Sequence, residues 1–176
     1  YCELALGDSK VVIWADVYRP VVHVEIEGRK AVKPRVSYEN WRYADRPYRK
    51  GEGQQGSWKW TSPKKNVRTS RDSIFPGQCD VTFFHHNPDS TVFDVTVARE
   101  GMDSVKHKLW NPLSRLASGG RLRGDNLRYV GTSDGVYDGT DYRSWNFESV
   151  RPSKKHHFSV ALHICRADKM AEWKAG

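Results

Sequence analysis

The sequence predicts an all-β fold with minor helix, namely an antiparallel β-sandwich or barrel with long loops and a short C-terminal helix. Short runs in which apolar and polar residues alternate recur along the 176 residues, and Gly, Pro, Asn and Asp bound most of them. Helical periodicity is almost absent, and a succession of strands without intervening helices is typical of sandwiches and barrels. Because the length is that of one domain, we expect residues 1–176 to form a single β-rich unit.

Two neighbouring strands are predicted near the start of the chain, at residues 10–17 and 21–27. In the second run, valine and isoleucine alternate with histidine and glutamate, which is the pattern of a strand with one face toward water. Pro20 lies between the two runs, and proline is tolerated at the start of a strand because it has no amide hydrogen to donate. A turn then leads to a further short strand at residues 31–37.

Residues 38–77 are expected to form a long loop region that is both basic and aromatic. Arginine and lysine outnumber the acidic residues there, tryptophan and tyrosine are interleaved with them, and only residues 56–61 have the pattern of a strand. Loops of this length in a compact domain are usually functional or disordered.

A β-hairpin is the clearest expectation of the sequence, at residues 79–99. Val81 and Phe83 share one face of its first arm, and Phe93 and Val95 share one face of its second arm. An Asn-Pro-Asp-Ser stretch between the arms favours a turn, because proline presets φ and the other side chains hydrogen-bond their own backbone.

After the hairpin, the sequence predicts a helical turn, a short strand, a polar loop, two further strands and a C-terminal helix. These elements are expected at residues 112–118, 127–130, 131–144, 145–150, 156–165 and 167–174. Gly119-Gly120 is expected to stop the helical turn. The strand at 156–165 alternates clearly and is expected to pair within the core sheet, while Trp173 of the terminal helix is expected to lean on the body of the domain.

The basic and aromatic loop region is the predicted binding face. Cationic side chains neutralise phosphate or sulfate groups, and indole and phenol rings stack on bases or on sugar faces. The alternative is that the rings plug the end of a sandwich and the charges are merely solvated. The candidate binding residues are Trp41, Arg42, Tyr43, Arg46, Tyr48, Trp58, Trp60, Lys64, Lys65 and Arg68.

The net charge of +8 favours an anionic partner such as nucleic acid or an acidic glycan, although a protein partner is equally compatible with the binding face. We expect no cofactor, and no apolar run approaches the roughly 20 residues of a membrane-spanning helix. The leading hypothesis is a non-enzymatic binding protein that resembles secreted effectors, lectins or toxins in kind. A structural subunit of a virion or of an extracellular assembly is an alternative, and the sequence leaves the oligomeric state open.

Secretion is expected from two observations. The first is that the chain starts with Tyr1 rather than Met. The second is the placement of the three cysteines, which are too few and too widely spaced for a zinc framework but could form one disulfide. In an oxidising compartment at most one disulfide can form, either Cys2 with Cys165 or Cys79 with Cys165.

Two further kinds of site are weighed as alternatives. A metal-independent nuclease would use His86, His107 or His157 as acid and base beside the arginines. A calcium ion would take oxygen ligands from Asp134, Asp138 and Asp141, which lie close together in a polar stretch; however, the spacing is not that of an EF-hand, and Asp-Gly pairs are above all turn formers.

Overall fold

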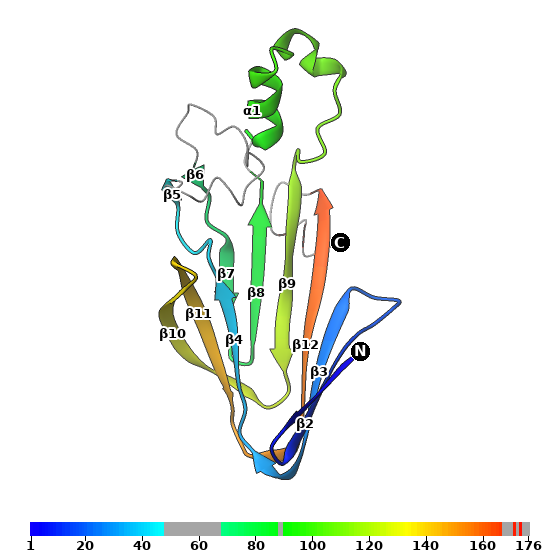
Figure 1. Cartoon of the computed structure of the whole chain (residues 1–176), viewed down its shortest axis with the longest axis vertical. Helices are drawn as coiled ribbons and strands as arrows, with labels where there is room; N and C mark the ends of the chain where they lie inside the picture. Colours follow the sequence, from blue (N-terminus) through cyan, green and yellow to red (C-terminus); the bar gives the residue numbers. More distant parts are fainter. Residues whose placement is uncertain (48–67, 88–89, 167–170, 172, 174–176) are drawn as a thin grey trace.

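The computed structural model describes residues 1–47, 68–87, 90–166, 171 and 173, and it confirms the predicted antiparallel all-β architecture (Figure 1). In chain order, the elements are β1 Cys2–Leu6, β2 Ser9–Ala15, β3 Val21–Val32, β4 Arg35–Asn40, β5 Arg46–Pro47, β6 Arg68–Thr69, β7 Ser73–Pro76, β8 Asp80–His86, α1 Val92–Arg99, the 3₁₀ helix η2 Asp103–Lys108, β9 Leu116–Gly124, β10 Leu127–Tyr137, β11 Thr140–Ser149 and β12 Ser153–Arg166.

A seven-stranded sheet with the order β1-β2-β3-β12-β9-β8-β7 forms the larger layer. The strands predicted at 10–17 and 21–27 are β2 and β3, which pair antiparallel as expected. The strand predicted at 156–165 is β12, and it lies in the middle of the sheet between β3 and β9. Strong local alternation therefore identified β3 and β12 correctly, whereas the neighbouring interior strand β9 was not predicted.

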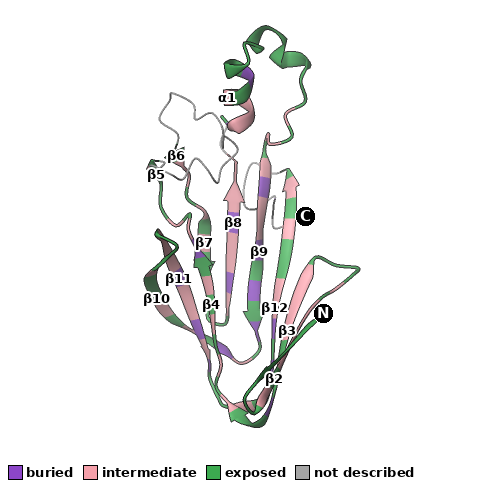
Figure 2. Ribbon diagram, in the orientation of Figure 1, coloured by how far each residue is buried: buried purple, intermediate pink, exposed green. Residues whose placement is uncertain are grey.

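The smaller layer is a three-stranded sheet with the order β10-β11-β4, and it packs on one part of the larger sheet. The core between the layers joins Val81, Leu122 and Phe158 of the large sheet to Leu127 and Phe147 of the small one. Figure 2 shows buried positions on β8, β9 and β11, the strands that meet there. A separate two-stranded ladder pairs β5 with β6.

The small sheet covers only part of the inner face of the large sheet. Beyond the core, the alternation that buries Phe158 continues along β12 to Leu162 and Ile164, yet these side chains are 45% and 63% exposed. The register places Phe83 and Gly120 beside Leu162 in one row across three strands. The inner face therefore extends past the small sheet as an accessible, partly apolar surface.

The opposite face of the large sheet carries a second, smaller core. Phe84 and Ala117 are buried there under Trp173, whose ring centroid lies 5.2 Å from that of Phe84. The expected packing of Trp173 on the body is thus confirmed, while most of the predicted helix at 167–174 lies outside the described residues.

The prediction of a β-hairpin at 79–99 is wrong for its second arm, because that segment forms the helix α1. The carboxylate of Asp94 accepts a hydrogen bond of 2.7 Å from the Thr91 backbone N–H, which satisfies one donor at the start of the helix. At the other end Gly101, with φ of 67°, and the bond from Met102 N–H to Val97 O form a Schellman motif. Local capping thus overrides an apolar alternation that fits a strand equally well.

Within the described residues, neither α1 nor η2 is long and apolar enough to cross a bilayer.

Two other local expectations are also wrong. Gly119 and Gly120 do not stop a helical turn; they lie inside β9, where a Cβ on Gly119 would come within 2.1 Å of the Phe83 carbonyl oxygen. The glycines are needed because neighbouring backbone approaches closely. The polar stretch at 131–144 is the β10–β11 hairpin rather than a loop, with Asp138 and Gly139 at φ of 47° and 71° in its two-residue turn.

The expected disulfides are not formed, and all three cysteines are free. Cys2 lies in the row of Phe158, and Cys165 lies seven residues farther along β12, about 23 Å away along the strand. Cys79 directly precedes Asp80, which is in the row of Ser159, about 20 Å along the strand from Cys165. Because a disulfide needs Cα atoms within about 7 Å, neither pairing is compatible with this sheet register.

Candidate functional site

A groove of about 650 Å³ occupies the uncovered part of the inner face. It lies where the large sheet extends beyond β4, and it takes residues from four strands (β4, β8, β9 and β12) and from the loops next to them. The lining residues are Pro20, Tyr38, Arg42, Asp72, Phe83, His85, Ser118, Gly119, Leu162, His163 and Ile164.

One wall of the groove carries a hydrogen-bonded chain of polar side chains. His85 Nδ1 lies 2.7 Å from Asp72 Oδ1, and the Asn40 amide Nδ2 donates to Asp72 Oδ2 at 2.8 Å. The same amide nitrogen lies 3.0 Å from the hydroxyl oxygen of Tyr38. The side chains of His85 and Asp72 are only 16% and 12% exposed, so water screens their contact weakly. The carboxylate of Asp72 is therefore held by both of its oxygens.

The backbone fixes this wall. Asn40 ends β4, and its Oδ1 accepts a hydrogen bond of 2.6 Å from the Arg42 N–H, which turns the chain sharply after the strand. The Arg42 carbonyl then accepts a bond of 2.7 Å from the Asp72 N–H. Asp72 directly precedes β7, whose Ser73 pairs with Phe84, so the carboxylate is delivered beside His85 at the end of β8. Three segments thus meet at one point: the end of β4 with its turn, the start of β7 and the end of β8.

The floor of the groove is apolar. The Tyr38 ring stacks on Phe83 with a centroid distance of 4.3 Å, and this contact closes the end of the groove toward the small sheet. Leu162 and Ile164 continue the floor along β12, and Pro20 borders it. An apolar floor with a few fixed polar groups on one side is the usual composition of a small-molecule site.

Burial raises the pKa of the Tyr38 hydroxyl to about 12; the negative charge of Asp72 adds to this effect, and the hydrogen bond from Asn40 opposes it. The folded pKa thus lies above the ordinary value near 10, so the folded state holds this proton more tightly than the unfolded state. The resulting stabilisation is complete below pH 10 and is lost as the pH rises from 10 through about 12.

We expect the raised pKa of Tyr38 to be visible as a tyrosine that ionises late in a pH titration. In a spectrophotometric titration of the folded protein, the last phenolate should form near pH 12, and this step should be absent from Tyr38→Phe. Tyr18, which is 93% exposed, provides the matched control, because Tyr18→Phe should leave the late step in place. A late step that persists in Tyr38→Phe would contradict the assignment.

The structure describes five of the ten predicted binding residues. Arg42 is exposed and lines the groove. Trp41 is half-buried among rings of the β10–β11 hairpin, with its centroid 5.3 Å from that of Tyr142. The Tyr43 ring lies under the Arg143 guanidinium at 5.0 Å. The remaining two described residues belong to the small ladder, Arg46 to β5 and Arg68 to β6.

The other five predicted binding residues, Tyr48, Trp58, Trp60, Lys64 and Lys65, lie outside the described residues, as does the strand predicted at 56–61.

The three histidines of the nuclease alternative do not form one site. His86 is in the row of Cys165, and His157 lies eight residues away along β12, which is about 26 Å. His157 instead contacts His23, with 2.9 Å between Nε2 and Nδ1. His107 is exposed in η2, on the excursion between β8 and β9.

The three aspartates proposed as calcium ligands have other roles in the β10–β11 hairpin. Asp134 forms a bidentate ion pair with Arg143, at 2.7 and 2.9 Å, and Asp138 supplies the positive φ of the hairpin turn. Asp141 lies on β11 opposite Val136. Among the residues that the structure describes, no group of three potential ligands could hold a metal ion. The calcium hypothesis is therefore not supported by the arrangement of these side chains.

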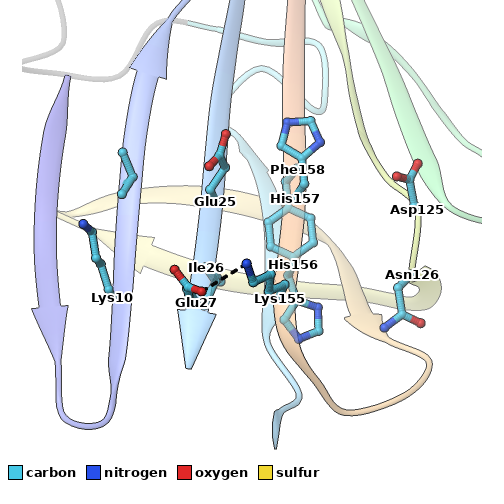
Figure 3. A pocket seen from close by; sticks show the side chains of 11 residues that line it. Lys10, Glu25, Ile26, Glu27, Asp125, Asn126, Lys155, His156, His157 and Phe158 are labelled. Carbon is cyan, nitrogen blue, oxygen red and sulfur yellow. Dashed lines mark ion pairs between the residues drawn. The ribbon is translucent and has the colours of Figure 1, made fainter. Parts of the chain in front are cut away.

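A second hollow, of about 660 Å³, lies on the outer face of the large sheet near the turn between β9 and β10 (Figure 3). Glu27 and Lys155 pair across it at 3.2 Å, and Asn126 is engaged with the backbone of Arg151. Its lining carries two lysines and three carboxylates, so it presents no excess of positive charge. The groove, in contrast, combines an exposed arginine with a fixed polar wall.

Sequence reasoning found Arg42 and missed the rest of the groove wall. Asn40, Asp72, His85 and Ser118 come from four strand ends, and the contacts between them depend on strand pairing. His85 directly follows the apolar pair Phe83-Phe84, whereas Asn40 and Asp72 each follow a charged residue, so no shared sequence pattern marks this wall.

The whole chain, residues 1–176, matches the model of the family described as a domain of unknown function (DUF5703), and the chain belongs to that family. No curated protein and no solved structure matches it.

Proposed function

We propose that this member of the DUF5703 family is a binding module, and that its groove holds an acidic carbohydrate. The observation that carries the proposal is the combination of the exposed Arg42 with the Asn40, Asp72 and His85 wall above an apolar floor. Each of these three parts matches one feature of such a ligand.

The apolar floor matches the C–H face of a sugar ring. Leu162 and Ile164 are 45% and 63% exposed, and they lie in neighbouring rows of the same face. Covering them with a ring would remove apolar surface from water, which is favourable by roughly 25 cal/mol per Å² buried. The wall beside the floor presents hydroxyl, carboxylate and imidazole groups, which exchange hydrogen bonds with sugar hydroxyls.

Arg42 matches the acidic group of the ligand. A guanidinium binds carboxylate or sulfate through two parallel N–H bonds, and such charge-assisted bonds are stronger than neutral ones. The net charge of +8 adds a general attraction for an anionic ligand. Nucleic acid fits the groove less well, because Asp72 would face the phosphate backbone, whereas a sugar hydroxyl can donate to that carboxylate.

Calorimetric titration with oligogalacturonate tests the proposal. Arg42→Gln should weaken binding about tenfold to a hundredfold, because it removes a hydrogen bond to a charged group. Arg29→Gln is the matched control, since Arg29 is exposed on β3 away from the groove and should leave the affinity unchanged. Binding should also weaken as the salt concentration rises.

Two outcomes would overturn the proposal. One is the absence of binding to oligogalacturonate and to a sulfated heparin fragment alike. The other is an equal loss of affinity in Arg42→Gln and Arg29→Gln, which would indicate a diffuse charge effect rather than a site in the groove.

A further inference from the structure

We infer that Ser118, His85 and Asp72 form a nucleophile, base and acid triad that hydrolyses a carboxylic ester in the groove. The inference rests on the proposed function only in that the ester would be carried by the carbohydrate ligand. The three residues come from three adjacent segments of the large sheet, and all of them line the groove.

The register of the sheet places the three residues in one row. His85 on β8 is the direct partner of Ser118 on β9. On the other side of β8, Ser73 pairs with Phe84. The antiparallel register therefore brings the preceding residue, Asp72, opposite His85. Neighbouring strands lie about 4.8 Å apart, and directly opposed side chains share a face of the sheet. The imidazole therefore contacts the carboxylate of Asp72 on the β7 side, and Ser118 occupies the directly opposed position on the β9 side.

The imidazole is oriented as a base. Asp72 Oδ1 lies 2.7 Å from His85 Nδ1, and a carboxylate accepts the Nδ1–H, so Nε2 remains as the proton acceptor. Asn40 donates to the second oxygen of Asp72 at 2.8 Å, which fixes the carboxylate. A held carboxylate, an oriented imidazole and a neighbouring hydroxyl are the arrangement that activates a serine nucleophile.

The reaction balances with water as the only co-reactant. Ser118 Oγ attacks the ester carbonyl carbon while its proton passes to His85 Nε2. The bond between the carbonyl carbon and the alcohol oxygen then breaks, and the alcohol leaves with that proton. Water attacks the acyl-serine and gives its proton to Nε2; the carboxylic acid leaves, and Ser118 regains its proton.

Covalent labelling tests this inference. A fluorophosphonate probe should attach to Ser118 with loss of fluoride, and peptide mass mapping of the wild-type protein should locate the adduct on that residue. The wild-type protein should also hydrolyse 4-nitrophenyl acetate. His85→Gln and Asp72→Asn should slow both reactions, His85→Gln by about a hundredfold or more, since general base catalysis contributes at least that much.

Matched controls come from the same sheet. Ser159 on β12 alternates with the groove-facing residues and lies on the opposite face, so Ser159→Ala should retain labelling and hydrolysis. His107→Gln, in η2, controls for the histidine change. Because the adduct is mapped on the wild-type protein, the test does not depend on the folding of Ser118→Ala.

The outcomes separate the two proposals. An adduct on Ser118 that depends on His85 supports the triad. Labelling elsewhere, or none, overturns the triad, and oligogalacturonate binding that persists in the same sample leaves the binding proposal standing. Labelling of Ser118 without any carbohydrate binding would support the triad and overturn the proposed ligand.

Discussion

Gly119→Ala should destabilise the fold by at least about 3 kcal/mol, the upper end of the usual cost of overpacking. A Cβ at this position would lie 2.1 Å from the Phe83 carbonyl oxygen and 2.9 Å from the Phe84 Cα. Both are backbone atoms of β8, so the clash can be relieved only by moving β8 away from β9. That movement would open the strand pairing that also aligns His85 with Ser118.

Urea unfolding followed by tryptophan fluorescence provides the measurement. Gly135→Ala is the matched control, because its Cβ would meet the tip of the Tyr142 ring at 2.5 Å, and that ring can rotate away. We expect the control to lose less than about 1 kcal/mol. Equal losses in the two variants would contradict the importance of the close approach between β8 and β9.

Phe147→Ala should lower the free energy of unfolding by about 3–5 kcal/mol, which is the usual cost of truncating a buried phenylalanine. Phe147 is fully buried and is the largest such side chain among the described residues. It projects from β11 into the core shared by the two sheets, with its centroid 5.4 Å from that of Tyr129. Since domains are stable by only about 5–15 kcal/mol, this loss is a large fraction of the total.

Chemical denaturation also measures this effect. The midpoint should fall while the slope m stays constant, which indicates a loss of stability without a change in the surface exposed on unfolding. Val136→Ala on the same hairpin is the control; Val136 is 66% exposed, and its truncation should change stability by no more than about 0.5 kcal/mol. A cost below 1 kcal/mol for Phe147→Ala would show that the small sheet is not packed on the large one.

The sequence predicted the strands with the clearest two-residue period. β3, β8 and β12 coincide with apolar alternation, β2 coincides with a continuous apolar run, and β2 and β3 pair as neighbours. Alternation is a local property of the chain, so it can be recognised without knowing what the strand contacts. The same pattern failed at residues 92–99, where the cap at Thr91 and the Schellman motif at Gly101 favour a helix.

Glycines were the second source of error. Gly119 and Gly120 were expected to stop a helix, because glycine usually marks a chain break. Their actual role is to let β9 approach the backbone of β8 and of β12. This role is invisible in the sequence, since it depends on which strands become neighbours.

The amino-acid sequence alone determined the all-β class, the positions of β2, β3, β8 and β12, and the place of Arg42 in a basic, aromatic segment, because composition and alternation act over a few residues. Only the tertiary structure decided that the small sheet leaves part of the inner face open and that Asp72, His85 and Ser118 stand in one row there. These residues are far apart in the chain, and a shift of one residue in the strand register would turn their side chains to the opposite face.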